Sequence, residues 1–112
     1  MVGARADGWW RDRAGAARRL HEALMTADVP QAAVVLVLEG GAKGGVRAGR
    51  DAHVRTVHAA RDGDAEIVAQ AQAAVDAGAR TTVVTADRVL QGRVLAVGAE
   101  YVGPTWLLAL LD

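Results

Sequence analysis

The sequence predicts an α/β fold in which helices cover both faces of a mostly parallel sheet, which is a three-layer sandwich. Short β-branched and aliphatic runs alternate along the chain with segments whose apolar residues recur at helical spacing. The runs are continuously apolar, which is typical of strands that are covered on both faces. Strands that alternate with helices indicate right-handed crossovers around a mostly parallel sheet.

The first half of the chain contains one expected helix and two expected strands. The helix is predicted over residues 9–25, with Asp7 placed to cap it. Residues 33–38 form an apolar run of strand length, and residues 54–58 are a second short strand. The intervening residues 40–52 contain five glycines together with basic side chains, so this segment is predicted to be a surface loop without a regular element.

The second half of the chain continues the alternation. The expected order is a helix over 65–77, a strand over 81–85, a helix over 88–97, a strand over 100–102 and a last helix over 105–111. Gly78 and Gly98 stand just after two of these helices, in the position where glycine commonly ends a helix.

Composition limits the classes of function. A chain of 112 residues is expected to form a single domain. Thirteen basic and thirteen acidic side chains cancel, so nucleic-acid binding would depend on a local patch. The absence of cysteine excludes zinc fingers and disulfide frameworks and favours a cytoplasmic location. The longest apolar runs are far shorter than the roughly 20 residues of a membrane-spanning helix, so no membrane partner is expected.

Acidic residues follow or begin several of the predicted elements. Glu39 stands at the end of the strand expected over 33–38, and Asp87 follows the strand expected over 81–85. Asp64 stands at the start of the helix that leads into the 81–85 strand. Because ligands of open parallel sheets bind beyond the carboxyl ends of the strands, we expect these carboxylates to converge at one edge. Converging carboxylates repel one another unless a cation lies among them, and Mg²⁺ suits such oxygen ligands. Helix capping is the competing explanation for Asp64 and Asp87, and a solvated strand end is the competing explanation for Glu39.

Four stretches of the chain resemble, in order and spacing, the PIN-like NYN or YacP-like domains of bacteria. They are residues 37–40 (VLEG), 63–68 (GDAEIV), 83–88 (VVTADR) and 103–108 (GPTWLL). The resemblance implies a PIN-like sandwich and a metal-dependent RNA-processing nuclease. It also implies that Glu39, Asp64 and Asp87 bind Mg²⁺ or Mn²⁺, and that Thr85 orients a water or a ligand carboxylate.

The implied chemistry is hydrolysis of a phosphodiester in RNA, which is expected to be single-stranded. A metal-bound water becomes more acidic and attacks phosphorus, while the metal offsets charge in the transition state. Basic side chains near the acidic edge are candidates for holding phosphates, although a solvated face explains them equally well. These are Arg11, Arg13, Lys43, Arg61 and Arg88.

The chain departs from the family pattern in two places. Ala65 occupies the second position of a usually paired acidic motif, and Glu66 stands one residue late, about 100° around the helix. The family also begins with a central strand that ends in Asp, and we expect Met1 to lie just beyond that strand, as in an N-terminally truncated domain. The alternatives are therefore a catalytically inactive module that binds RNA or protein, and an NTP pyrophosphohydrolase or small phosphatase. A homodimer is a minor possibility.

Overall fold

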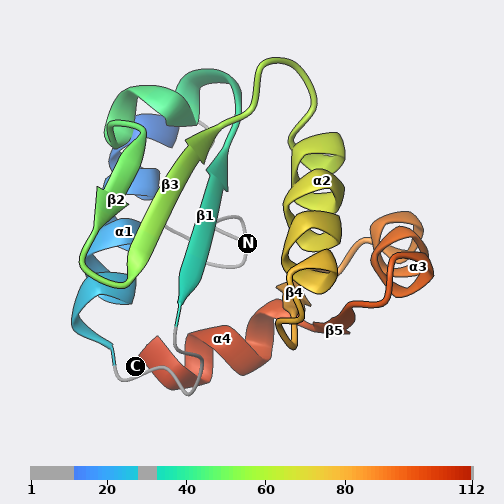
Figure 1. Cartoon of the computed structure of the whole chain (residues 1–112). Coiled ribbons are helices and arrows are strands. Elements are labelled where there is room, and N and C mark those ends of the chain that lie inside the picture. The colour runs from blue at the N-terminus through green and yellow to red at the C-terminus, as the bar shows by residue number, and fades with distance from the viewer. Residues whose placement is uncertain (1–11, 28–32, 112) are drawn as a thin grey trace. The chain divides into compact units, whose positions relative to one another are not determined.

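The computed structural model describes residues 12–27 and 33–111 and has an α/β fold with helices and two small sheets (Figure 1). The chain divides into two compact units, which are described separately. Of the described residues, the N-terminal unit comprises 12–27 and 33–63 together with Leu110 and Leu111, and the C-terminal unit comprises Asp64–Ala109.

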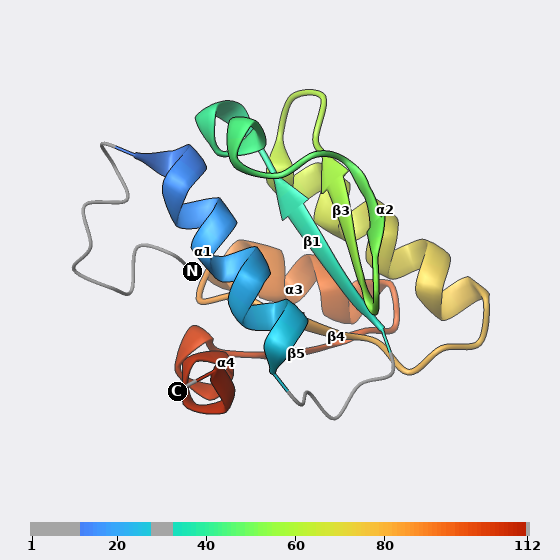
Figure 2. The same cartoon turned by 90° about the vertical axis from the view of Figure 1, so that its left-hand side faces the viewer.

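The N-terminal unit contains a three-stranded sheet with one helix against it. Its elements are α1 (Arg13–Thr26), β1 (Val34–Leu38), the 3-10 helix η2 (Gly40–Gly45), β2 (Gly49–Asp51) and β3 (Val54–His58). The strand order is β1-β3-β2, with β1 parallel and β2 antiparallel to β3. In two perpendicular views α1 lies along one face of this sheet (Figures 1 and 2).

Burial alternates along the strands of this sheet, as expected when one face carries the core. Leu36, Leu38 and Val54 are buried, whereas Val35, which precedes Leu36, is 43% exposed and Val37 is half-buried. On α1 the small side chains Ala16 and Ala17 and the larger Leu24 are buried. Small residues allow a helix to approach a sheet or a neighbouring segment closely, and α1 contacts β1, β3 and η2.

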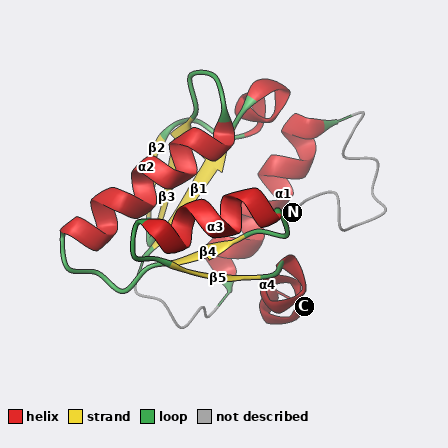
Figure 3. Ribbon diagram, turned by 90° about the vertical axis from the view of Figure 1, so that its right-hand side faces the viewer, coloured by secondary structure: helices red, strands yellow, loops and turns green. Residues whose placement is uncertain are grey.

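The C-terminal unit contains a two-stranded parallel sheet and most of the remaining helices. Its elements are α2 (Gly63–Asp76, whose first residue belongs to the N-terminal unit), β4 (Thr82–Val84), α3 (Arg88–Ala96), β5 (Glu100–Val102) and α4 (Pro104–Leu111, whose last two residues belong to the N-terminal unit). β4 pairs with β5 so that Val83 lies opposite Tyr101. α2, α3, β4 and β5 are seen together in Figure 3.

The core of the C-terminal unit is built from α2, α3 and the strand between them. Its buried centre consists of Ala71, Leu90, Val94 and Ala99, with Ile67, Val68, Val75, Val83 and Val97 packed against it. The α2 members recur at three and four residue spacing, which places them on one helical face. The helical periodicity in the sequence therefore corresponds to a packed face of α2.

The predicted start of the first helix is wrong. α1 begins at Arg13, and Asp12 is its N-cap, with the Asp12 Oδ1 accepting a hydrogen bond from the Gly15 backbone N–H at 2.8 Å. A Cβ at position 15 would overlap the Asp12 carboxylate, so a larger residue there would displace this side chain from its capping position. The predicted cap, Asp7, lies outside the described residues.

The prediction that residues 40–52 lack regular structure is also wrong. This segment contains η2 and β2, and all three side chains of β2 are exposed. β2 is held by backbone pairing with β3, for which side-chain hydrophobicity gives no signal. η2 lies against α1 because Gly45 has no Cβ, which would overlap the carbonyl oxygen of Ala14.

The predicted alternation of elements is otherwise confirmed, with shifts of a few residues at their ends. The strands in the described part of the chain form two sheets with two parallel pairs and one antiparallel pair. Among the described residues, no helix combines the length and the apolar character that crossing a membrane requires.

Candidate functional site

Glu39 lies directly after β1 and is held by the backbone at the start of α2. Its Oε2 accepts a hydrogen bond from the Gly63 N–H at 2.8 Å. A Cβ on Gly63 would lie 3.0 Å from the Glu39 Cδ, so glycine leaves room for this contact. The other oxygen, Oε1, has no hydrogen-bond partner within residues 12–27 and 33–111. Glu39 is exposed, so a ligand can reach this second oxygen.

Asp87 follows β4 and is the N-cap of α3. Its Oδ1 accepts hydrogen bonds from the backbone N–H groups of Val89 at 2.8 Å and Leu90 at 3.1 Å. This satisfies two of the N–H groups that an α-helix leaves unpaired at its start. Oδ2 makes no hydrogen bond with the described part of the chain, and Asp87 is exposed. The carboxylate is thus oriented through one oxygen and open through the other.

Thr85 links the end of β4 to the turn that carries Asp87. Its backbone N–H donates to the Val102 carbonyl at 2.9 Å, which extends the pairing of β4 with β5. Its hydroxyl accepts from the Asp87 N–H at 3.0 Å, and its carbonyl accepts from Gln91 Nε2 at 3.1 Å. Thr85 is only 8% exposed, so its principal observed role is to fix the backbone on either side of Asp87.

Asp64 and Glu66 lie in the first turn of α2, where carboxylates interact favourably with the helix dipole. Asp64 is half-buried. Glu66 accepts a hydrogen bond from Gln70 Nε2 at 3.1 Å, one turn further along the helix. The late acidic residue that follows Ala65 is therefore engaged with its own helix.

Glu39 accepts its hydrogen bond from Gly63, which is the residue immediately before Asp64 in the sequence. Asp87 belongs to the C-terminal unit, in which it caps α3. Within residues 12–27 and 33–111, no three His, Asp or Glu side chains are grouped so that they could hold a metal ion. Convergence of the carboxylates on a shared ion stays a prediction.

The basic residues predicted to hold phosphates are differently placed. Lys43 Nζ donates to the Ala59 carbonyl at 2.8 Å, so its ammonium group ties η2 to the end of β3. Arg13 and Arg88 are exposed first residues of α1 and α3, and Arg61 is exposed between β3 and α2. Arg11 lies outside the described residues.

His53 and His58 each engage a backbone carbonyl through a ring nitrogen. His53 Nε2 lies 2.9 Å from the Leu24 carbonyl oxygen, and His58 Nε2 lies 2.7 Å from the Val46 carbonyl oxygen. Since a carbonyl only accepts, each ring donates through Nε2. His21, in contrast, lines a pocket.

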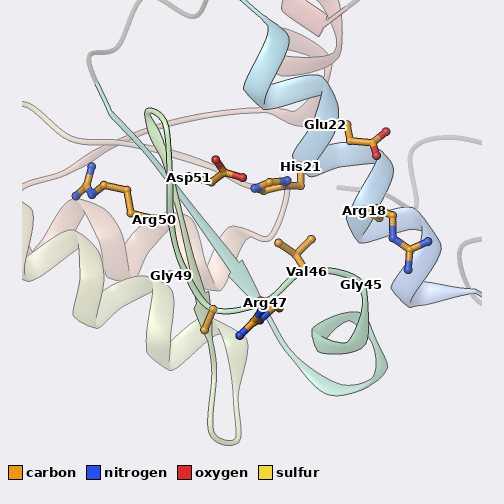
Figure 4. A pocket seen from close by; sticks show the side chains of 10 residues that line it. Arg18, His21, Glu22, Gly45, Val46, Arg47, Gly49, Arg50 and Asp51 are labelled. Carbon is orange, nitrogen blue, oxygen red and sulfur yellow. The ribbon is translucent and has the colours of Figure 1, made fainter.

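That pocket, of about 370 Å³, lies between α1 and the segment that connects η2 to β3 (Figure 4). The side chains that matter for its chemistry are Arg18, His21, Glu22, Arg47, Arg50 and Asp51. Sequence analysis missed it because these residues were assigned to a helix face and to a loop. No spacing in the sequence indicates that the two segments meet.

The two buried threonine hydroxyls offer a matched test of local hydrogen bonding. Thr56 is 2% exposed and its Oγ1 has no partner among the described residues, whereas the Thr85 hydroxyl accepts from Asp87. Thr56→Val is expected to raise the free energy of unfolding by about 1 kcal/mol, because an unpaired buried hydroxyl is replaced by an isosteric methyl group. Thr85→Val is expected to lower it by about 1 kcal/mol or more. Urea denaturation of the two variants decides, and equal changes would contradict the assignment.

The sequence matches no protein-family model, and neither a curated protein nor a solved structure matches it.

Proposed function

We propose that this chain is a magnesium-dependent RNA nuclease of the PIN-like NYN kind, with a three-layer arrangement of its elements. The observation that carries the proposal is the hydrogen bonding of two carboxylates, which lie at the carboxyl ends of parallel strands. Glu39 after β1 and Asp87 after β4 each accept backbone N–H groups through one oxygen and leave the other oxygen open. A carboxylate oriented in this way by a hydrogen bond is a suitable metal ligand.

In the proposed site Glu39, Asp64 and Asp87 supply oxygen ligands to Mg²⁺ or Mn²⁺. The ion supplies a more acidic bound water and offsets negative charge on the phosphate. Thr85 acts by holding the turn in which Asp87 lies, since its hydroxyl accepts from the Asp87 N–H. The substrate is single-stranded RNA, whose phosphates are held in part by the exposed Arg61 and Arg88.

A second candidate is a catalytically inactive PIN-like module that binds RNA or protein. Two observations favour it, the first being that the hydrogen bonds of Glu39 and Asp87 give each carboxylate a structural role that requires no metal. The engagement of Glu66 with Gln70 favours it as well, since Glu66 is the nearest substitute for the acid that Ala65 replaces. Capping and catalysis are separable, because a cap needs an acceptor oxygen whereas a metal ligand of this kind needs a charge.

The test for Asp87 uses this separation. Asp87→Asn retains a good N-cap, so the free energy of unfolding should change by less than about 0.5 kcal/mol. Cleavage of single-stranded RNA in Mg²⁺ or Mn²⁺ should fall by about 100-fold or more, since even groups that only support metal ligands are worth 10- to 100-fold. Asp12→Asn is the matched control, because Asp12 is also an N-cap and has no place in the proposed site.

Outcomes of this assay discriminate the candidates. Metal-dependent cleavage that Asp87→Asn abolishes and Asp12→Asn retains supports the nuclease. RNA binding without cleavage at any Mg²⁺ or Mn²⁺ concentration supports the inactive module. Hydrolysis of nucleoside triphosphates with no RNA cleavage contradicts both and indicates a pyrophosphohydrolase.

A companion test separates charge from placement at Glu39. Glu39→Gln keeps an acceptor for the Gly63 N–H but removes the charge, so we expect RNA cleavage to be lost while the fold persists. Gly63→Ala keeps the charge but places a Cβ 3.0 Å from the Glu39 Cδ and 3.1 Å from Oε2, which displaces the carboxylate. Cleavage should fall in both variants. Full activity of Glu39→Gln would exclude Glu39 as a metal ligand.

A further inference from the structure

The pocket between α1 and residues 45–51 lies entirely within the N-terminal unit. Its volume of about 370 Å³ lies at the lower end of the range for small-molecule sites. One wall is a face of α1 that carries Arg18, His21 and Glu22 at three and four residue spacing. The opposite wall is the glycine-rich turn into β2 and the strand itself.

Two arginines stand at the rim of this pocket without an internal partner. Arg18 and Arg47 are both exposed, and neither forms an ion pair or a hydrogen bond with residues 12–27 or 33–111. Arg18 and Glu22 are one helical turn apart, yet no salt bridge joins them in the described part of the chain. A guanidinium fork binds phosphate oxygens in pairs, so both groups are available to an anionic ligand.

Apart from its arginines, the polar side chains that line the pocket are those of His21, Glu22 and Asp51. Figure 4 shows the Asp51 carboxylate and the His21 ring pointing toward each other across the pocket. Asp51 and Glu22 contribute acceptor oxygens, and His21 contributes a ring that either donates or accepts. These carboxylates repel a bare phosphate, but they accept hydrogen bonds from hydroxyl groups. The pocket therefore suits a ligand that has an anionic end and a hydroxyl-bearing body.

We propose that this pocket binds the ribose phosphate group of a nucleotide, with the phosphate at Arg47 and the sugar hydroxyls at Asp51. An acidic side chain that accepts from ribose hydroxyls is a recurrent device in nucleotide sites. Gly49 carries no side chain and has open space where a Cβ would lie, so the backbone can approach the ligand there. The site is distinct from the acidic residues of the proposed nuclease and does not depend on that proposal. Its nucleotide is either free or part of an RNA strand.

Arg50 provides a matched internal control. Arg50 lines the pocket, but its side chain points away from His21 and Asp51 (Figure 4). This is expected because successive side chains of a strand such as β2 point to opposite faces. Arg50→Ala removes the same charge as Arg47→Ala from a position only three residues away. A specific site distinguishes the two substitutions, whereas general attraction of anions to a basic surface does not.

The experiment titrates the isotopically labelled full chain with ribose 5-phosphate, inorganic phosphate and ribose, and follows backbone amide resonances by NMR. Ribose 5-phosphate is expected to shift the amides of Arg47 and Gly49 and to bind more tightly than either of its components. Arg47→Ala should weaken binding of ribose 5-phosphate about tenfold, which corresponds to the loss of one charge-assisted contact. Arg50→Ala should change it less than twofold. Asp51→Asn should weaken binding of ribose 5-phosphate while leaving that of inorganic phosphate unchanged or improved.

Adenosine 5′-monophosphate and a short uridine oligonucleotide distinguish the two sources of the ligand. Tighter binding of the mononucleotide assigns the pocket to a free nucleotide, and tighter binding of the oligonucleotide assigns it to RNA. The proposal is overturned if ribose 5-phosphate at about 10 mM leaves the amides of residues 45–51 unmoved. It is equally overturned if Arg50→Ala and Arg47→Ala weaken binding to the same extent.

Discussion

Replacement of Gly45 with alanine is expected to lower the free energy of unfolding by about 3 kcal/mol, at the upper end of the cost of overpacking. A Cβ at this position would overlap the carbonyl oxygen of Ala14 and lie 2.8 Å from its carbonyl carbon. The obstacle is helix backbone rather than a flexible side chain, so α1 and η2 must separate to accommodate it. Urea denaturation followed by circular dichroism measures the loss.

Gly44→Ala is the control for this substitution. A Cβ on Gly44 would lie 3.7 Å from the Ala14 Cβ, which is ordinary van der Waals contact. Both variants change glycine to alanine within η2, so their effects on the unfolded chain are the same. We expect Gly44→Ala to remain within about 0.5 kcal/mol of the parent. Similar losses in the two variants would show that the close approach of η2 to α1 does not exist in solution.

Leu90→Ala is expected to lower the free energy of unfolding by about 3 kcal/mol, because it opens a cavity in the core of the C-terminal unit. Leu90 is 2% exposed and packs with Ala71, Val94 and Ala99. Their small side chains cannot extend to fill the space that the removed atoms leave. The loss should be visible as a lower denaturation midpoint.

Leu95→Ala tests the same chemical change on the opposite face of the same helix. Leu95 is 53% exposed, so its truncation should cost less than about 1 kcal/mol. The difference between the two variants reports the orientation of α3. If Leu95→Ala proves as costly as Leu90→Ala, then α3 buries a different face from the one described.

Much of the fold was predictable because its elements carry their own signals. β1 and β4 are short β-branched and aliphatic runs, and α3 is capped by Asp87 and followed by Gly98, which has a φ of +94°. These features are local, since they depend on residues close in sequence. They therefore identify an element without knowledge of what packs against it.

The features that escaped prediction depend on pairing between distant segments. β2 has only exposed side chains, and its existence follows from hydrogen bonds to β3. The start of α1 was missed because Asp7 and Asp12 are equally plausible caps by type, and only the close approach of Asp12 to Gly15 decides between them.

The candidate site was predictable at the level of individual residues. Glu39 and Asp87 lie at the ends of strands, as their positions in the sequence indicated. Their hydrogen bonds differ in origin, because the Asp87 cap follows from local sequence while the contact from Glu39 to Gly63 spans 24 residues. The pocket between α1 and residues 45–51 has no local signal in the sequence, because its two walls meet only in the folded chain.

The three-stranded sheet of the N-terminal unit has two unlike borders. β2 forms one border with the short sequence Gly49, Arg50 and Asp51, whose charges and glycine discourage a further strand from adding. β1 forms the other with five consecutive aliphatic residues and none of these deterrents. Self-association by strand addition would thus be directional: β1, and not β2, is the border along which this sheet would grow into a larger assembly or an aggregate.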